Sequence, residues 1–184
     1  MIWALQRHTM LAIDIETLGL PSQKPLPPIT CICLYDGEKE HTFLFYSSGK
    51  TREAFHQEED DFKPKKAKVI ELLDSAECIV GFNAVCFDLE YIKLYFGLPQ
   101  AQLAAWIKKT LDPFMSMKHL LGKTCSLKSI LAMNGLPSKS GSGLEAIQWA
   151  KEVPHSLNPH YSIFTAVFEH ICDRAKWILW LSTV

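Results

Sequence analysis

The chain has 184 residues, with 19 basic and 20 acidic side chains, a formal net charge of −1 and 48% hydrophobic residues. This length suits one domain with a core of its own, and the apolar content excludes a disordered chain. No uncharged apolar run approaches the ~18 residues of a membrane span, and the near-neutral charge argues against a broadly basic nucleic-acid coat. We therefore expect a single domain over residues 1–184 that has no membrane partner.

The N-terminal half of the chain is expected to form mainly strands. His8–Ile15 reads as a short buried strand, and the proline-rich stretch Gly19–Pro28 reads as a loop. Strands at Ile29–Tyr35 and His41–Tyr46 flank an Asp36-Gly37 turn and predict a hairpin.

The next segments alternate between helix and strand. After a polar excursion over residues 47–63, a helix is expected at Pro64–Ser75, with the proline in its first turn. A buried strand follows at Cys78–Phe82. The remaining helical segments are Phe87–Phe96, Trp106–Leu121, Leu127–Asn134 and Ser162 to about Leu181. This order predicts an α/β fold with a mixed β-sheet flanked by α-helices.

The cysteines and the N-terminus indicate the compartment. The six cysteines include no CxxC pair and most lie in apolar stretches, which is typical of reduced thiols in an intracellular protein. Acidic residues follow the N-terminal apolar stretch with no small-residue cleavage site, so we expect no secretory signal. The predicted location is intracellular, in the cytoplasm or the nucleus.

Two carboxylates interrupt the first predicted strand. Asp14 and Glu16 are two residues apart, so in a strand both project from the same face. Burying such a pair is costly unless a positive group lies between the carboxylates, and a divalent cation with oxygen ligands is the obvious candidate. The alternative is that the strand emerges from the core here and that both acids are solvated.

Two further acidic segments have the same ambiguity when each is taken alone. Asp88 lies five residues after Asn83, where a buried strand leads into a helix, so Asp88 could be a helix-start residue and Asn83 a turn former. Near the C-terminus, Asp173 follows Glu169 by four residues and His170 by three, which places all three within a turn of one another on a helix. Glu169 could equally be solvated and His170 a surface or core histidine.

Together, the three segments resemble the three exonuclease motifs of the DnaQ-like, or DEDD, 3′–5′ exonuclease superfamily, which has the ribonuclease H-like fold. Leu11–Gly19 (LAIDIETLG) is similar to the first motif, and Val80–Ile92 (VGFNAVCFDLEYI) is similar to the second. Asp112 resembles an aspartate that commonly lies between motifs two and three. The resemblance covers roughly residues 8–178.

The resemblance implies a metal-dependent 3′–5′ exonuclease that releases nucleoside monophosphates from single-stranded or frayed DNA or RNA 3′ ends. Two divalent ions, Mg²⁺ or Mn²⁺, would activate a water and stabilise the leaving 3′ oxygen. The implied metal ligands are Asp14, Glu16, Asp88 and Asp173. The implied substrate-binding residues are Thr17 and Leu18 at the terminal nucleotide, and Asn83 and Phe87 in the wall formed by the second motif.

The third motif departs from the family pattern. The family places a tyrosine four residues, or a histidine five residues, before the last aspartate, where this chain has Glu169 and Phe168. His170 or Glu169 could take over as the catalytic general base. The alternative is a catalytically weakened or inactive exonuclease-like module that binds nucleic acid or a protein partner. A third possibility is that the chain acts as the proofreading partner of a separate polymerase.

The segment between motifs two and three has a biased charge. From Gln100 to Leu144 the one acid is Asp112, whereas six lysines fall there: Lys108, Lys109, Lys118, Lys123, Lys128 and Lys139. These lysines could line the path of an entering strand, or they could belong to solvated helix faces.

Overall fold

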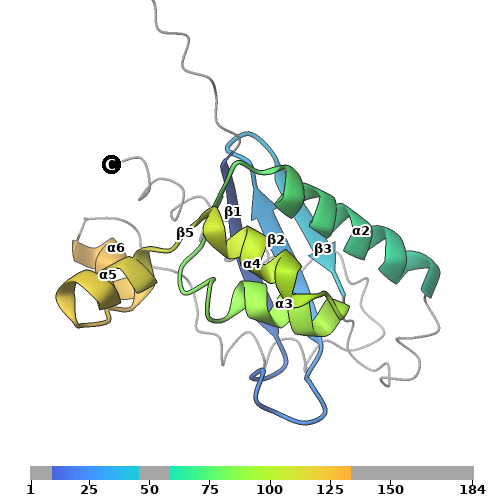
Figure 1. The fold of residues 1–184 in the computed structure, drawn as a ribbon, viewed down its shortest axis with the longest axis horizontal. Coiled ribbons are helices and arrows are strands. Elements are labelled where there is room, and N and C mark those ends of the chain that lie inside the picture. The colour runs from blue at the N-terminus through green and yellow to red at the C-terminus, as the bar shows by residue number, and fades with distance from the viewer. Residues whose placement is uncertain (1–9, 46–58, 134–184) are drawn as a thin grey trace, which may run out of the picture.

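The computed structural model describes residues 10–45 and 59–133, which form a five-stranded sheet with helices against it (Figure 1). The strands lie in the order β3-β2-β1-β4-β5. β1 pairs antiparallel with β2 and parallel with β4, so the sheet is mixed and the predicted α/β class is confirmed. The strand bounds are β1 Met10–Thr17, β2 Ile29–Tyr35, β3 Glu40–Leu44, β4 Cys78–Val80 and β5 Thr110–Leu111.

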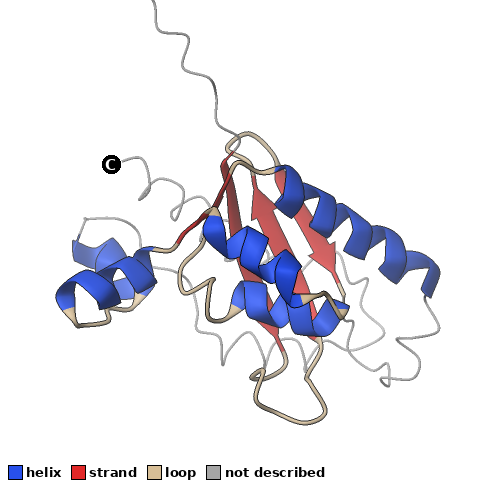
Figure 2. Cartoon of the chain, viewed as in Figure 1, coloured by secondary structure: helices blue, strands red, loops and turns tan. Residues whose placement is uncertain are grey.

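The helices of the described residues lie in two places. α2, α3 and α4 lie over one face of the sheet, whereas α5 and α6 lie together beyond β5 (Figures 1 and 2). The helix bounds are α2 Glu59–Ser75, α3 Asp88–Phe96, α4 Gln100–Lys108, α5 Pro113–Leu121 and α6 Leu127–Met133. None of these helices is long and apolar enough to cross a membrane.

The central strand β1 presents a different chemistry on each face. Leu11, Ile13 and Ile15 are buried in the main core cluster, together with side chains of α2, α3 and α4. Because side chains alternate along a strand, the even-numbered residues of β1 face the other way. Asp14 and Glu16 are therefore on the face opposite the main core.

A second, smaller core covers part of that opposite face. Met10 of β1 and Val80 of β4 pack there with Leu127 and Leu131 of α6. Residues 10, 12, 14 and 16 lie on the same face of β1. The helix α6 therefore covers the start of this face at Met10, and Asp14 and Glu16 lie farther along it.

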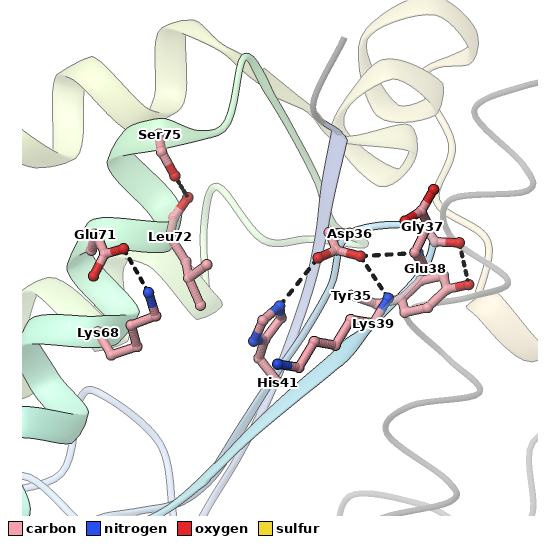
Figure 3. Close-up of polar contacts among 10 residues, drawn as sticks. All are labelled: Tyr35, Asp36, Gly37, Glu38, Lys39, His41, Lys68, Glu71, Leu72 and Ser75. Atoms are coloured by element: carbon pink, nitrogen blue, oxygen red, sulfur yellow. Dashed lines mark hydrogen bonds and ion pairs between the residues drawn. The ribbon is translucent and has the colours of Figure 1, made fainter. Parts of the chain in front are cut away.

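The predicted hairpin is confirmed, and its turn is held by one aspartate. Asp36 accepts hydrogen bonds from the backbone N–H groups of Glu38 and Lys39 at 2.9 and 2.7 Å, and its other oxygen lies 3.2 Å from His41 Nε2 (Figure 3). Partial burial raises the pKa of Asp36, but these bonds lower it by more, so the pKa lies below its usual value.

The helix predicted to start at Pro64 begins five residues earlier, at Glu59, so the prediction that the proline lies in the first turn is wrong. The additional residues include Phe62, whose ring packs against Phe45 and Phe96 with centroids 5.7 and 5.9 Å away. Pro64 removes one backbone hydrogen bond, and this aromatic packing offsets that loss.

The single helix predicted at Trp106–Leu121 is also wrong, because the chain there ends α4, forms β5 and then starts α5. Pro113 cannot continue a helix, and Asp112 accepts hydrogen bonds from the N–H groups of Phe114 and Met115 as an N-cap. Thr110 and Leu111 pair with β4 instead. The helix predicted from Ser162 lies outside the described residues.

Candidate functional site

The two carboxylates of the first motif lie on β1 and are buried. β1 continues to Thr17, beyond the predicted end at Ile15, so Asp14 and Glu16 are both within the strand and share a face. Their exposed fractions are 3% and 7%. The interpretation that these acids are solvated at the emerging end of the strand is therefore wrong.

The carboxylate of the second motif contacts β1 between these two residues. Asp88 Oδ1 accepts a hydrogen bond from the backbone N–H of Ile15 at 2.9 Å, and Asp88 is 4% exposed. β4 pairs with β1 only as far as Ala12, so Asp88 takes the position that a β4 carbonyl would occupy farther along the strand. The N-terminus of α3 also stabilises the Asp88 carboxylate, because Asp88 is the first residue of that helix. The fold thus brings the acidic residues of motifs one and two to the same part of β1.

The absence of a side chain at Gly81 lets the segment between β4 and α3 pass close to Ile13 of β1. A Cβ atom added at Gly81 would lie 2.4 Å from Ala84 Cβ and 3.0 Å from Ile13 Cγ2. Asn83 has a φ of 65°, a left-handed conformation that asparagine tolerates better than most residues. Gly81 and Asn83 therefore allow the tight path that leads to Asp88.

Asp112 anchors the same segment from the other side. Its buried carboxylate accepts hydrogen bonds from the N–H groups of Asn83 and Val85 at 2.9 and 3.1 Å, in addition to its two bonds at the start of α5. The resemblance to the family marks this aspartate, but the sequence does not reveal that it ties the second motif to α5. The bond partners are 27 and 29 residues away in the chain.

The loop that follows β1 is tied to α3. Thr17 Oγ1 donates to Gly19 O at 2.7 Å, and the N–H of Leu18 donates to Pro28 O at 3.1 Å. The buried Tyr91 donates its hydroxyl proton to Pro27 O at 2.8 Å. Tyr91 was not predicted as a site residue, although it lies three residues after Asp88 and so on the adjacent turn of the same helix.

Burial raises the pKa of Tyr91 above the ordinary value of a tyrosine, and its hydrogen bond with Thr17 opposes this shift in part. Tyr91 therefore remains protonated and able to donate over the whole neutral range.

The other predicted site residues are divided between the described and the undescribed parts of the chain. Phe87 is half-buried, and its ring centroid lies 5.6 Å from that of Tyr91, which places Phe87 beside the anchored loop. Asn83 is half-buried in the segment before α3. The third motif, with Asp173, His170 and Glu169, lies outside the described residues, so the roles of these three residues stay predictions.

The described carboxylates suit a hard cation but do not by themselves complete a site. Mg²⁺ and Mn²⁺ prefer oxygen ligands, and Asp14, Glu16 and Asp88 supply buried carboxylates from two elements. In the described ranges 10–45 and 59–133, no three acidic, histidine or cysteine side chains group closely enough to hold an ion. The fourth predicted ligand, Asp173, is beyond these ranges.

Comparison with protein families assigns the chain. A family model described as the RNase H superfamily matches residues 11–152, about three quarters of the sequence. The protein belongs to this superfamily, and the predicted ribonuclease H-like fold is confirmed. No curated protein matches the sequence.

Several solved structures are similar to this chain, and the one with a TM-score above 0.5 shares its fold. A family B DNA polymerase from the hyperthermophilic archaeon Pyrobaculum calidifontis superposes with a TM-score of 0.59 at 15% identity, over 95% of this chain and 24% of the polymerase. A structure of exonuclease I gives 0.48 at 19% identity, over 88% of this chain and 43% of that protein. E. coli exonuclease I in complex with a dT13 oligonucleotide gives a TM-score of 0.43 at 19% identity, over 93% of this chain and 42% of that protein. The chain thus spans about a quarter of the polymerase and under half of exonuclease I.

Replacing Asp112 by alanine tests whether this carboxylate holds the second motif. The change leaves four backbone N–H groups without their acceptor, so we expect the free energy of unfolding to fall by at least about 3 kcal/mol. Amide hydrogen exchange at Asn83 and Val85 should accelerate. Asp112→Asn keeps one acceptor oxygen, so its free energy of unfolding should fall by less than that of Asp112→Ala.

The matched control for Asp112 is Asp36→Ala, which removes an aspartate that accepts two backbone N–H bonds in an exposed turn. Water replaces these bonds, so the expected loss is about 1 kcal/mol or less. Equal losses for Asp36→Ala and Asp112→Ala, with unchanged exchange at Asn83 and Val85, would contradict the anchoring role.

Replacing Tyr91 by phenylalanine tests the tie between the loop and α3. Loss of the buried donor to Pro27 O should lower the free energy of unfolding by about 1 kcal/mol at neutral pH. Because the pKa of Tyr91 is raised in the folded protein, its contribution is complete below about pH 10, the ordinary pKa of tyrosine, and is lost as pH rises through the folded-state pKa. Denaturant unfolding across alkaline pH should therefore show a steeper decline for the natural protein than for Tyr91→Phe.

The control for Tyr91 is Tyr35→Phe, since the exposed Tyr35 hydroxyl also donates to a backbone carbonyl, that of Gly37 (Figure 3). We expect this variant to follow the alkaline decline of the natural protein. The tie is refuted if Tyr91→Phe shows the same stability as the natural protein at every pH.

Proposed function

We propose that the protein is a 3′–5′ exonuclease that hydrolyses the terminal phosphodiester of nucleic-acid 3′ ends and releases nucleoside monophosphates. The observation that carries this proposal is the hydrogen bond from the Ile15 N–H to Asp88 Oδ1, which places the second-motif carboxylate beside the buried pair Asp14 and Glu16. Membership of the RNase H superfamily supports it. Three carboxylates buried in one region would be stabilised by bound cations, and such cations could in turn bind the phosphodiester that reacts.

In this proposal, Asp14, Glu16 and Asp88 hold two divalent ions, Mg²⁺ or Mn²⁺, together with Asp173. When bound, the ions neutralise developing negative charge at the reacting phosphate and make water a stronger nucleophile. The protein supplies the fixed positions of the carboxylates: β1 holds two of them, and the Ile15 N–H orients the third. Burial of the carboxylates strengthens every electrostatic interaction at this point.

The remaining roles concern the substrate and the proton. Thr17 at the end of β1 and Leu18 in the following loop, which Tyr91 contacts at Pro27, contact the 3′-terminal nucleotide. Asn83 and Phe87 form the neighbouring wall. His170 or Glu169 accepts the proton of the attacking water. The substrates are single-stranded or frayed 3′ ends of DNA or RNA.

Degradation of labelled oligonucleotides tests the proposal directly. With Mn²⁺, the protein should shorten a 5′-labelled single strand stepwise from a free 3′ end and leave a 3′-blocked strand intact. Asp14→Asn should lower the rate by at least about 10³-fold, because the loss of a metal ligand removes several kcal/mol of transition-state stabilisation. Matched DNA and RNA strands identify the preferred sugar.

The control variant is Glu71→Gln, which removes an exposed acid of α2 that pairs with Lys68 and should leave the rate unchanged. If the natural protein does not shorten any strand, or if Asp14→Asn cuts equally fast, the proposal fails. Tight binding of the strands without any cutting would favour the alternative, a nuclease-derived binding module.

Metal-dependent stability provides a readout apart from activity. Added Mn²⁺ at 100 times its dissociation constant should stabilise the EDTA-treated protein by about 2.7 kcal/mol. Asp14→Asn should raise stability without metal, because it relieves repulsion among buried carboxylates, and should abolish the response to Mn²⁺. Thermal unfolding with and without Mn²⁺ measures both effects, and an unaltered Mn²⁺ response in Asp14→Asn would contradict the assignment of Asp14 as a ligand.

A further inference from the structure

We propose that the exposed side of α5 and α6 binds the phosphodiester backbone of a single-stranded nucleic acid upstream of the 3′ end that enters the site. We call this region the α5–α6 surface and define it by Lys118, Lys123 and Lys128. The inference rests on the proposed exonuclease function, whose chemistry it extends to the path of the strand.

The segment that contains α5 and α6 carries positive charge and no acidic side chain. Residues 113–133 contain three lysines and His119 and no aspartate or glutamate. All three lysines are exposed. In a chain with a formal net charge of −1, such an acid-free stretch concentrates positive potential on one surface.

The lysines of the α5–α6 surface differ in their ion pairing from lysines on α2 and α3. On α2, Lys68 pairs with Glu71 (Figure 3) and Lys65 pairs with Asp61. On α3, Lys93 pairs with Glu90. Within the described ranges, Lys118, Lys123 and Lys128 form no ion pair. Among residues 10–45 and 59–133, no acid therefore neutralises the positive charge of the α5–α6 surface, whereas Lys65, Lys68 and Lys93 each have an acidic partner.

The helix α6 lies close to Asp14 along the direction of β1. Leu127 and Leu131 fix α6 over Met10, on the face of the sheet that also presents Asp14. Asp14 lies four residues farther along β1, which corresponds to about 13 Å at 3.3 Å per residue. A strand whose 3′ end is at the carboxylates covers this distance with about four nucleotides at duplex spacing, and with fewer when it is extended.

The helix α5 contacts the segment that leads to Asp88. Phe114 of α5 packs edge-to-face on Phe82 with ring centroids 5.5 Å apart, and Cys86 Sγ lies 3.6 Å from Met115 Sδ. Lys118 is one turn beyond Phe114 on the same face of α5. The helix α5, which carries Lys118, thus packs against the part of the second motif that precedes Asp88.

The surface also exposes apolar side chains. Leu120, Leu121 and Met133 are 77%, 67% and 71% exposed. A single strand presents both phosphates and unpaired base faces, so a surface that combines lysines with apolar groups suits it better than a duplex.

The test uses the triple variant Lys118→Gln, Lys123→Gln and Lys128→Gln. Fluorescence anisotropy with a labelled dT12 strand, in an Asp14→Asn background to prevent cleavage, should show at least about tenfold weaker binding. The slope of log affinity against log salt should become shallower by about 2, because each lost phosphate contact contributes about 0.7 for single strands. Hydrolysis of a dinucleotide, measured with Asp14 intact, should change by less than about twofold, because it is too short to reach the surface from the carboxylates.

The control is Lys63→Gln, Lys65→Gln and Lys68→Gln, which makes the same charge change on α2 and should leave both measurements within about twofold of the natural protein. Unchanged dT12 affinity and salt slope in the α5–α6 variant would overturn this inference even if the protein degrades 3′ ends. A shallower salt slope in a protein that cuts nothing would support the surface while refuting the proposed nuclease. Equal losses in both triple variants would also overturn it, since the effect would then be one of net charge.

Discussion

The arrangement of the site depends on one hydrogen bond, from the backbone N–H of Ile15 to the carboxylate of Asp88. β4 pairs with β1 only as far as Ala12. Beyond that point, the Ile15 N–H on this side of β1 needs another hydrogen-bond acceptor. The first residue of α3 supplies this acceptor, and an acidic side chain is stable there because of the helix N-terminus. The same contact that completes the sheet therefore brings Asp88 to the strand that carries Asp14 and Glu16.

Several constraints maintain this contact. Gly81 lets the chain pass against Ile13, and Asp112 accepts the N–H groups of Asn83 and Val85. One turn after Asp88 on α3, the Tyr91 hydroxyl holds the loop that follows β1. The acids are thus fixed by packing and hydrogen bonding in the described residues, which reduces the reorganisation that would accompany binding of a cation and a phosphate.

The sequence predicts the elements best where a periodic pattern and a local signal agree. The two-residue spacing of Asp14 and Glu16 predicted that both share a face of β1, and the hairpin followed from Asp36-Gly37 between two apolar runs. The predictions failed where a distant contact determined the outcome: Phe62 extends α2 past Pro64, and β5 forms because β4 is its neighbour. Tyr91 and the N–H partners of Asp112 could not be found from the sequence because their contacts join residues 27 to 64 positions apart.

The central claim is that the buried acids of β1 and α3 hold divalent ions. Anomalous diffraction from crystals of the full chain soaked in Mn²⁺ tests this claim most directly. We expect Mn²⁺ within about 2.5 Å of carboxylate oxygens of Asp14, with Asp88 or Glu16 as a further ligand. Well-ordered Mn²⁺ bound elsewhere, with none at Asp14, would contradict it.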